Sequence, residues 1–314
     1  MMRHASVLLH ETIDLLDVKP DGIYVDGTLG RGGHAGLLLS RLQNGHLYAF
    51  DKDETALNES AQNLKEYGDR VTYLHEDFRN MKAVLAQLGV EEADGIMMDL
   101  GVSSPQFDDP ERGFSYRFDT RLDMRMDRTQ RLSAWEVVNR YPFQDLVRIL
   151  KEYGEERYAK AIARAIERQR EASPIDTTGQ LADTVRSALP DAVLRKKGHP
   201  AKQTFQAIRI EVNHELDSLQ EGLNDACSLL KTGGRCAVIT FHSLEDRIVK
   251  TTFRRLSSAP SVDPRLPLKA SQMEQASFSL VTRHPVIAGE EELEENRRSH
   301  SAKLRVIERI RKAG

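Results

Sequence analysis

The 314-residue sequence has few cysteines, few aromatic residues and no long apolar run. Its two cysteines, Cys227 and Cys236, lack the spacing of a metal site, and they are too few for a disulfide scaffold. No apolar stretch approaches the ~18 residues of a membrane span, and the N-terminal residues do not have the pattern of a signal peptide. We therefore expect a soluble, cytoplasmic protein without a membrane partner and without a metal site.

The sequence also lacks an excess of either charge. It has 45 Lys and Arg against 48 Asp and Glu, which gives a formal net charge of −3. This balance excludes a globally basic nucleic-acid-binding protein, so any contact with nucleic acid must come from a local basic patch. The length is sufficient for two domains, or for one domain with a large insertion.

A glycine-rich loop, residues 26–34, separates a predicted strand at 22–25 from a predicted helix at 35–42. Glycines allow the backbone to turn sharply and approach a ligand, and the start of a helix presents free N–H groups to that ligand. The glycine spacing also fits a dinucleotide fingerprint. However, Asp26 at the strand end repels an anionic pyrophosphate and suits S-adenosylmethionine (SAM), which carries a sulfonium and an ammonium. The loop therefore favours SAM over NAD.

An acidic residue follows each of the next three predicted strands. These strands span residues 46–50, 71–74 and 95–98. With Asp26, the acids Asp51, Asp77 and Asp99 occupy the carboxyl ends of strands, where open α/β sheets bind ligands. The Asp51 carboxylate can accept hydrogen bonds from both hydroxyls of a ribose, each worth about 1.5–3 kcal/mol. Asp77 and Phe78 suit the amine and the face of an adenine. Four such acids favour a cofactor site over ordinary turn or cap aspartates.

The segment from Asp99 to Gln106 follows the fourth strand, where amino-methylating SAM enzymes commonly receive the target amine. An exocyclic amine on cytosine has its lone pair delocalised into the ring, so it needs positioning and a hydrogen-bond acceptor. Asp99 is the best acceptor available and is the candidate catalytic residue, while Gln106 is placed to fix the base or the cofactor. Methylation at ring carbon 5 would require a cysteine on this loop, and the loop has none.

The alternation of strands and helices stops at Asp99, and the next clear strand spans 235–241. Five helices are predicted between them, at 134–140, 143–153, 155–170, 178–188 and 203–230. We predict an α/β fold: a Rossmann-like class I SAM methyltransferase sheet formed by residues 1–106 and 201–314, with an inserted helical substrate-recognition domain at 107–200. The other predicted elements are a helix at 244–256, two closing strands at 278–282 and 303–309, and a solvated acidic loop at 290–295.

Six motifs, in this order, resemble those of the bacterial small-subunit (16S) ribosomal RNA cytosine-N4 methyltransferases. They occupy residues 26–34, 99–106, 112–115, 122–127, 153–157 and 241–247, and the resemblance runs from His4 to Arg309. It implies SAM-dependent methylation of the N4 amine of a cytidine in the decoding region, on RNA within the small ribosomal subunit. It also implies cofactor contacts at Gly32, Gly33, His34, Asp51, Phe78, Asp99 and Gln106. The resemblance assigns no catalytic base.

Three basic groups are candidates for RNA contact. On the predicted helix at 155–170, four cations fall within about 80° of one another: Arg157, Lys160, Arg164 and Arg168. The other two groups are the six arginines between Arg112 and Arg131 and the loop at 195–200. Nearby acids offer the opposite interpretation, in which these cations form ion pairs or a solvated face. For 112–131 we expect a mixture, with ion pairs around Asp123 and Asp127. His242 is either close to the substrate or structural.

We thus expect a direct displacement at the cofactor methyl group, without a covalent enzyme intermediate. Two alternatives stay open. The first is an NAD-dependent oxidoreductase, which Asp26 disfavours. The second is a non-catalytic RNA-binding assembly factor that holds SAM as a sensor, which the intact 99–106 segment disfavours. The sequence does not determine the oligomeric state.

Overall fold

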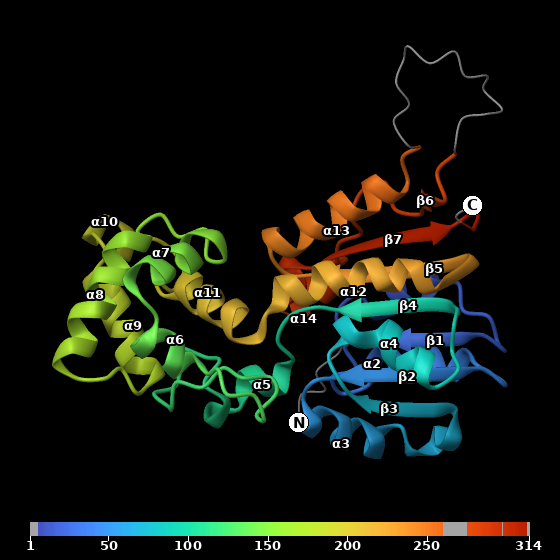
Figure 1. Cartoon of the computed structure of the whole chain (residues 1–314), viewed down its shortest axis with the longest axis horizontal. Coiled ribbons are helices and arrows are strands. Elements are labelled where there is room, and N and C mark those ends of the chain that lie inside the picture. The colour runs from blue at the N-terminus through green and yellow to red at the C-terminus, as the bar shows by residue number, and fades with distance from the viewer. Residues whose placement is uncertain (1–5, 260–274, 297, 313–314) are drawn as a thin grey trace, which may run out of the picture. The chain divides into compact units, whose positions relative to one another are not determined.

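The computed structural model describes residues 6–259, 275–296 and 298–312. Its chain divides into two compact units (Figure 1). The sheet unit combines residues 1–101 with 217–314, and the helical unit is residues 102–216. The two segments of the sheet unit are joined in one sheet, because the strand that follows the helical unit pairs with the last strand before it.

Seven strands form this sheet in the order β3-β2-β1-β4-β5-β7-β6. Their bounds are β1 (Ile23–Asp26), β2 (His46–Asp51), β3 (Val71–His75), β4 (Ala93–Asp99), β5 (Leu230–Thr240), β6 (Phe278–Leu280) and β7 (Lys303–Arg309). Strands β1 to β5 are parallel, whereas β7 is antiparallel to both β5 and β6. The order reverses between β1 and β4, so the carboxyl ends of these strands flank the switch point where such sheets bind ligands. The predicted α/β sheet is confirmed.

Helices cover both faces of the sheet and bury alternate strand residues. The sheet unit contains α1 (Leu9–Leu16), α2 (Gly33–Arg41), α3 (Glu54–Asn63), α4 (Met81–Gln87), α12 (Glu215–Leu229, which begins at the end of the helical unit), α13 (Ser243–Leu256) and α14 (Glu290–Glu295). One core contains Tyr24 and Met97 with residues of α1, α2 and α3. The other contains Val25 and Met98 with residues of α4, α12 and α13. Because neighbouring strand residues point to opposite faces, both central strands are buried on both sides.

Short 3-10 segments join several of these elements. In the sheet unit they are η1 (Lys65–Arg70), η2 (Phe78–Asn80) and η5 (Ser299–Ser301).

The helical unit has a core of its own. It contains α5 (Ser104–Asp108), η3 (Pro110–Arg112), α6 (Ala134–Arg140), α7 (Phe143–Glu152), α8 (Ala159–Ala172), α9 (Thr178–Ser187), α10 (Asp191–Leu194) and α11 (Lys202–Asn213). Buried apolar residues from α6, α7, α8, α9 and α11 form one cluster, which includes Leu146, Ile162, Leu181 and Ile208. Each of these helices therefore has one apolar face toward a shared interior.

The helical unit is longer than the expected insertion at 107–200. It extends to residue 216 because α11 packs with α6 and α7, and its Phe205 and Ile208 lie in the helical core. The single helix expected at 203–230 is in fact two helices. His214 adopts a left-handed conformation (φ 50°) between α11 and α12, and Arg209 bridges the break with two 2.8 Å bonds to the Glu215 carboxylate.

Two further expectations were wrong in detail. The helix expected at 155–170 starts only at Ala159, because Glu155 has a left-handed φ of 50° and the Glu156 carboxylate accepts the Tyr158 N–H at 2.9 Å. The acidic run at 290–295 forms α14 instead of a loop, and its Glu292 Oε1 accepts the Leu8 N–H at 3.0 Å. Within the described ranges, no helix is both long and apolar enough to cross a membrane.

Candidate cofactor and active site

The loop after β1 is held in a tight conformation that glycine alone adopts easily. Gly30 and Gly32 have φ values of 53° and 79°, and a Cβ on Gly33 would collide with the Ser6 hydroxyl. The Gly30 N–H donates to Asp51 Oδ2 at 2.8 Å, and the Ser60 hydroxyl donates to the Gly30 carbonyl at 2.6 Å. Both the N–H and the carbonyl of Gly30 are therefore hydrogen-bonded, which fixes the loop. Helix α2 starts directly after it.

Three carboxyl groups lie at the ends of β1, β2 and β4. Burial raises the pKa of Asp26 to about 7; the Thr28 N–H opposes this rise, and the charges of Asp99 and Asp51 add to it. Burial likewise raises the pKa of Asp51 to about 6, against the N–H groups of Asp53 and Gly30. Burial also raises the pKa of Asp99 to about 7. The charges of Asp51 and Asp99 disfavour ionisation of Asp26, so a cation bound at this edge of the sheet would favour its charged form.

Asp99 combines a fixed backbone with an unsatisfied side chain. Its N–H donates to Thr28 Oγ1 at 2.6 Å, which ties the end of β4 to the loop after β1. The side chain is 30% exposed, but its Oδ1 is buried and has no hydrogen-bond partner among the described residues. A buried acceptor of this kind is costly unless a ligand supplies the donor.

His34 lies beside Asp99 as a neutral base. Its Nε2 is 3.1 Å from the Val7 carbonyl, so Nε2 carries the proton and Nδ1 carries a lone pair. Nδ1 is 3.8 Å from Asp99 Oδ2. Burial lowers the pKa of His34 to about 4, so the ring is uncharged near neutral pH. Asp99 thus faces a lone pair and not an imidazolium.

Two charged residues that were not predicted at the site act on Asp99. The Arg298 guanidinium lowers the Asp99 pKa, and Glu245 raises it. Arg298 also lies over the Phe241 ring, 5.6 Å from its centroid. Glu245 was visible as part of the 241–247 motif, whereas nothing in the sequence near Arg298 distinguishes it from other surface arginines.

His242 and Glu245 lie together at the start of α13. Glu245 Oε2 accepts the N–H groups of Phe241 and His242 at 2.8 and 3.2 Å, and His242 Nε2 lies 3.1 Å from Glu245 Oε1. These contacts form the start of α13, whose first residue follows His242. Both ring nitrogens of His242 are nevertheless buried without a hydrogen-bond partner among the described residues, so both interpretations of His242 stay open.

Asp77 and Phe78 are less available than expected. The Asp77 carboxylate is 2.8 Å from Lys52 Nζ and accepts the Ser218 hydroxyl at 3.0 Å. Phe78 is buried against Gly222 of α12, and its Cβ would lie 3.2 Å from a Cβ on Gly27. The Phe78 side chain therefore packs against Gly27 and supports the glycine-rich loop. Contact with an adenine stays a prediction.

Gln106, the remaining predicted site residue, belongs to the helical unit. It is buried, and its Oε1 accepts the Ser103 N–H at 3.0 Å. The sheet unit by itself brings together Gly32, Gly33, His34, Asp51 and Asp99 around the end of β1. The role of Gln106 stays a prediction.

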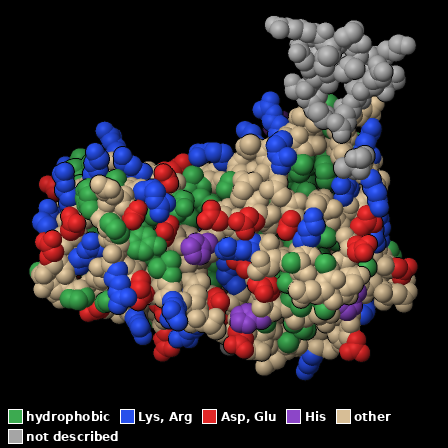
Figure 2. All heavy atoms as spheres, viewed as in Figure 1, with side chains coloured by type: hydrophobic (Ala, Val, Ile, Leu, Met, Phe, Trp, Pro, Cys, Tyr) green, Lys and Arg blue, Asp and Glu red, His purple; other side chains and the backbone are tan. Residues whose placement is uncertain are grey.

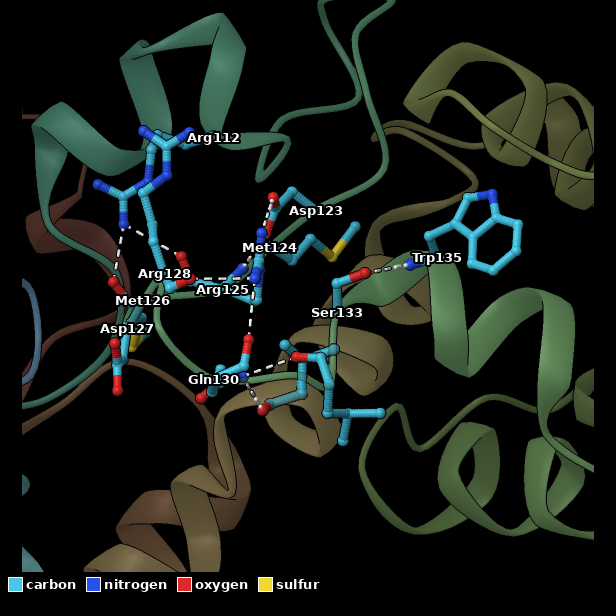
Figure 3. A network of polar contacts seen from close by, with 12 residues as sticks. Arg112, Asp123, Met124, Arg125, Met126, Asp127, Arg128, Gln130, Ser133 and Trp135 are labelled. Carbon is cyan, nitrogen blue, oxygen red and sulfur yellow. Dashed lines mark hydrogen bonds and ion pairs between the residues drawn. The ribbon is translucent and has the colours of Figure 1, made fainter.

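Two of the six arginines at 112–131 are structural (Figure 3). Arg112 donates to the carbonyls of Arg125 and Met126 at 3.0 and 2.9 Å. Arg125 forks onto Asp123 with bonds of 2.7 and 2.8 Å and also reaches the Gln130 carbonyl. These bonds support the left-handed Met124 (φ 60°). Asp127 accepts the Thr129 N–H and makes no ion pair within the described segments, so the ion pairs expected around it are absent there.

The basic side chains on α8 point to solvent. Lys160, Arg164 and Arg168 are exposed, whereas Ile162 and Ile166 are fully buried. The three cations make no ion pair with any described residue. Arg157 is exposed too but precedes the helix. In the 195–200 loop, Arg195, Lys196 and Lys197 are exposed, and His199 stacks on Tyr116 with ring centroids 4.0 Å apart.

The residues at the end of β1 fit SAM. The glycine loop admits a close approach of the ligand to the backbone, the three acidic groups suit its sulfonium and ammonium charges, and Asp99 Oδ1 needs a donor. The same acidic groups would repel the pyrophosphate of NAD.

A sequence profile described as the MraW methylase family matches residues 1–310. Among solved structures, the chain is similar to an rRNA methylase from Streptococcus thermophilus, with 13% identity, 99% of each chain covered and a TM-score of 0.44. It is also similar to a SAM-dependent O-methyltransferase from Thermotoga maritima, with 12% identity, a TM-score of 0.41, and 100% of this chain and 70% of that chain covered. The match over nearly the whole chain shows that this protein belongs to the MraW methylase family of SAM-dependent rRNA methyltransferases.

Proposed function

We propose that this protein methylates the exocyclic N4 amine of a cytidine in the decoding region of small-subunit (16S) ribosomal RNA. The observation that carries the proposal is Asp99 at the end of β4, whose Oδ1 is buried and unsatisfied and whose pKa is raised to about 7 by burial. Such a group accepts a hydrogen bond from an amine and takes up a proton at neutral pH. The position of the cytidine in the RNA rests on the six motifs.

The cysteines support an amine target over a ring-carbon target. Cys227 in α12 and Cys236 in β5 are the two cysteines of the chain, and both are buried in the core. A hydrogen bond with Cys227 and burial raise the pKa of the Cys236 thiol, so it stays protonated. Attack on cytosine carbon 6 requires an accessible thiolate. Neither cysteine can provide one.

Within this proposal, each residue has a defined task. SAM supplies a methyl group on a cationic sulfur. The Asp51 carboxylate binds the ribose hydroxyls, and the N–H groups of Gly33 and His34 at the start of α2 face the cofactor, beside Gly32, whose own N–H donates to the Leu29 carbonyl at 2.8 Å. Asp99 accepts a hydrogen bond from the N4 amine, stabilises the positive charge that develops on nitrogen, and takes the proton that the methylated amine loses.

The substrate side of the proposal rests on the helical unit. The exposed face of α8 and the 195–200 loop offer cations that have no acidic partner in the described part of the chain, which suits RNA phosphates. Arg112 and Arg125 are excluded from this role because their guanidinium groups hold the 122–130 loop.

The test is to incubate the protein with labelled SAM and small ribosomal subunits that lack the modification, and then to identify the labelled nucleoside. We expect N4-methylated cytidine at one position. Label in 5-methylcytidine would contradict the amine assignment. SAM binding without any label transfer would favour the non-catalytic assembly factor.

A further inference from the structure

Helix α13 of the sheet unit presents a second basic surface. Leu244, Val249 and Phe253 are buried on its inner side. The outer side carries Arg247, Lys250, Thr251, Arg254, Arg255 and Ser258, which line a shallow hollow of about 460 Å³. We call these six residues the α13 patch. Figure 2 shows Lys and Arg side chains gathered along this helix.

The acidic residues of α13 do not neutralise the patch. Glu245 is buried and accepts the N–H groups that begin the helix. Asp246 pairs with Arg305 Nε at 2.7 Å and with Lys303 Nζ at 3.3 Å, both on β7. Both carboxylates of the helix are thus engaged away from the patch, and the two acids and four cations of α13 are segregated on different sides.

Three of the four cations of the patch have few alternative partners among the described residues. Lys250, Arg254 and Arg255 make no ion pair with a described residue, although Arg255 donates to Asn224 Oδ1 at 2.9 Å. Arg254 and Arg255 lie in the last turn, where cations stabilise the helix dipole. That explanation does not apply to Lys250, which is in the middle of the helix. The folded structure alone therefore does not account for the patch.

We infer that the α13 patch binds phosphate groups of the RNA substrate. This inference rests on the proposed function for its choice of RNA. Arg247, Lys250 and Arg254 are spaced over about 10 Å of helix, a length that can serve more than one phosphate. Arginine forks match phosphate oxygens, and Thr251 and Ser258 add hydroxyl donors. The patch has no apolar anchor, so it does not suit a protein partner.

The experiment compares two double variants with the same change of charge. Lys250→Gln with Arg254→Gln removes two cations of the patch. Lys65→Gln with Lys82→Gln removes two exposed lysines elsewhere in the sheet unit and is the matched control. For each, KM for unmodified small subunits is measured from about 50 to about 200 mM salt. The binding of the same subunits is measured by co-sedimentation, and calorimetry gives the SAM affinity.

The patch variant should raise KM for subunits about tenfold, and the slope of log affinity against log salt should become shallower by about 1.4–1.8, which corresponds to two lost phosphate contacts. The kcat, SAM affinity and melting temperature should match those of the control. The inference is overturned if both variants give the same KM and slope, or if the loss is in SAM affinity. Failure of the proposed function looks different: the wild type would bind subunits without forming N4-methylcytidine.

Discussion

Among single residues, Asp99 has the clearest expected effect on catalysis. Asp99→Asn keeps the size of the side chain but removes its ability to take a proton or to stabilise a developing cation. Loss of one preorganised electrostatic partner typically costs about 10²–10³ in kcat. We expect a decrease of that size with saturating SAM and subunits, measured as initial rates of label transfer, with a much smaller change in SAM affinity.

The cysteines are the control for this experiment. Cys236→Ala removes a buried thiol from the core cluster that contains β4 and β5. If the mechanism is amine transfer, a folded Cys236→Ala variant retains turnover. Loss of activity in that variant, with Asp99→Asn near the wild type, would show that the reaction proceeds through ring carbon.

The raised carboxyl pKa values predict how SAM affinity depends on pH. Burial raises the pKa of both Asp26 and Asp99 to about 7, so these groups are neutral below that pH and anionic above it. A cationic ligand binds the anionic form more tightly. SAM affinity should therefore be highest above pH 7 and should fall as the pH decreases through 7. Calorimetry at pH 6, 7 and 8 measures this dependence.

The neutral thioether product, S-adenosylhomocysteine, is the matched ligand. It lacks the sulfonium charge, so its affinity should decrease less between pH 8 and pH 6. Equal decreases for both ligands would mean that the carboxyl groups do not sense the sulfonium. The position of Asp26 was predicted from the sequence, but its pKa was not, because that shift depends on burial within the folded sheet.

At the scale of elements, strands were easier to predict than helix ends. Strands such as β2 and β4 are short, mainly apolar runs that end in an aspartate, so they can be recognised from the local sequence. Helix ends depend on single backbone conformations. The left-handed residues Glu155 and His214 are not themselves glycines, and the side-chain hydrogen bonds beside them, from Tyr158 N–H to Glu156 and from Arg209 to Glu215, are not evident from the sequence.

The same limit applies to the arginines at 112–131. Arg112 and the exposed Arg117 look alike in the sequence, yet Arg112 is buried because backbone carbonyls about a dozen residues away accept its hydrogen bonds (Figure 3). Every residue has a backbone carbonyl, so the sequence does not show which carbonyls accept the hydrogen bonds of Arg112. An acidic partner such as Asp123 can be identified from the sequence.

The Asp123–Arg125 pair should matter for the stability of its loop. Arg125→Lys keeps the charge but loses the fork that joins Asp123 to the carbonyls of Arg128 and Gln130. We expect the free energy of unfolding to fall by about 1–3 kcal/mol, the range for unsatisfied buried groups. Denaturant unfolding measures it. A variant as stable as the wild type would show that lysine satisfies the same groups.

The exposed face of α8 should contribute to RNA binding and not to cofactor binding. Arg164→Glu with Arg168→Glu reverses two charges that have no acidic partner among the described residues. We expect weaker binding of small subunits and a shallower salt dependence. SAM affinity should be unchanged, since the predicted cofactor residues other than Gln106 lie in the sheet unit. Normal methylation at physiological salt would mean that this face is only solvated.

At the scale of the whole molecule, the chain forms two compact units from three segments. The interruption of the sheet was predictable because the strand pattern stops at Asp99 and resumes more than a hundred residues later. The C-terminal boundary of the helical unit was not predictable, because the apolar face of α11 suits a crossover helix as well as a helical bundle. The structure shows that α11 packs against α6 and α7, which places it in the helical unit.

The single tryptophan allows the two units to be observed separately. Trp135 lies in the helical unit, where its indole donates to Asp176 Oδ1 at 2.8 Å, so its fluorescence reports the melting of that unit. SAM at about 100 times its Kd stabilises the unit that binds it by about 2.7 kcal/mol. For a sheet unit of about 200 residues this corresponds to a rise of about 5–10 °C in the melting temperature.

Circular dichroism, which follows both units, should therefore show a SAM-dependent rise, while the midpoint of Trp135 fluorescence should move much less. The Asp51→Ala variant should bind SAM more than tenfold more weakly, because each hydrogen bond that its carboxylate makes to the ribose is worth about 1.5–3 kcal/mol. It should lose most of the rise at the same SAM concentration. An equal shift of both signals would mean that the units melt together, and an undiminished shift in Asp51→Ala would remove Asp51 from the cofactor site.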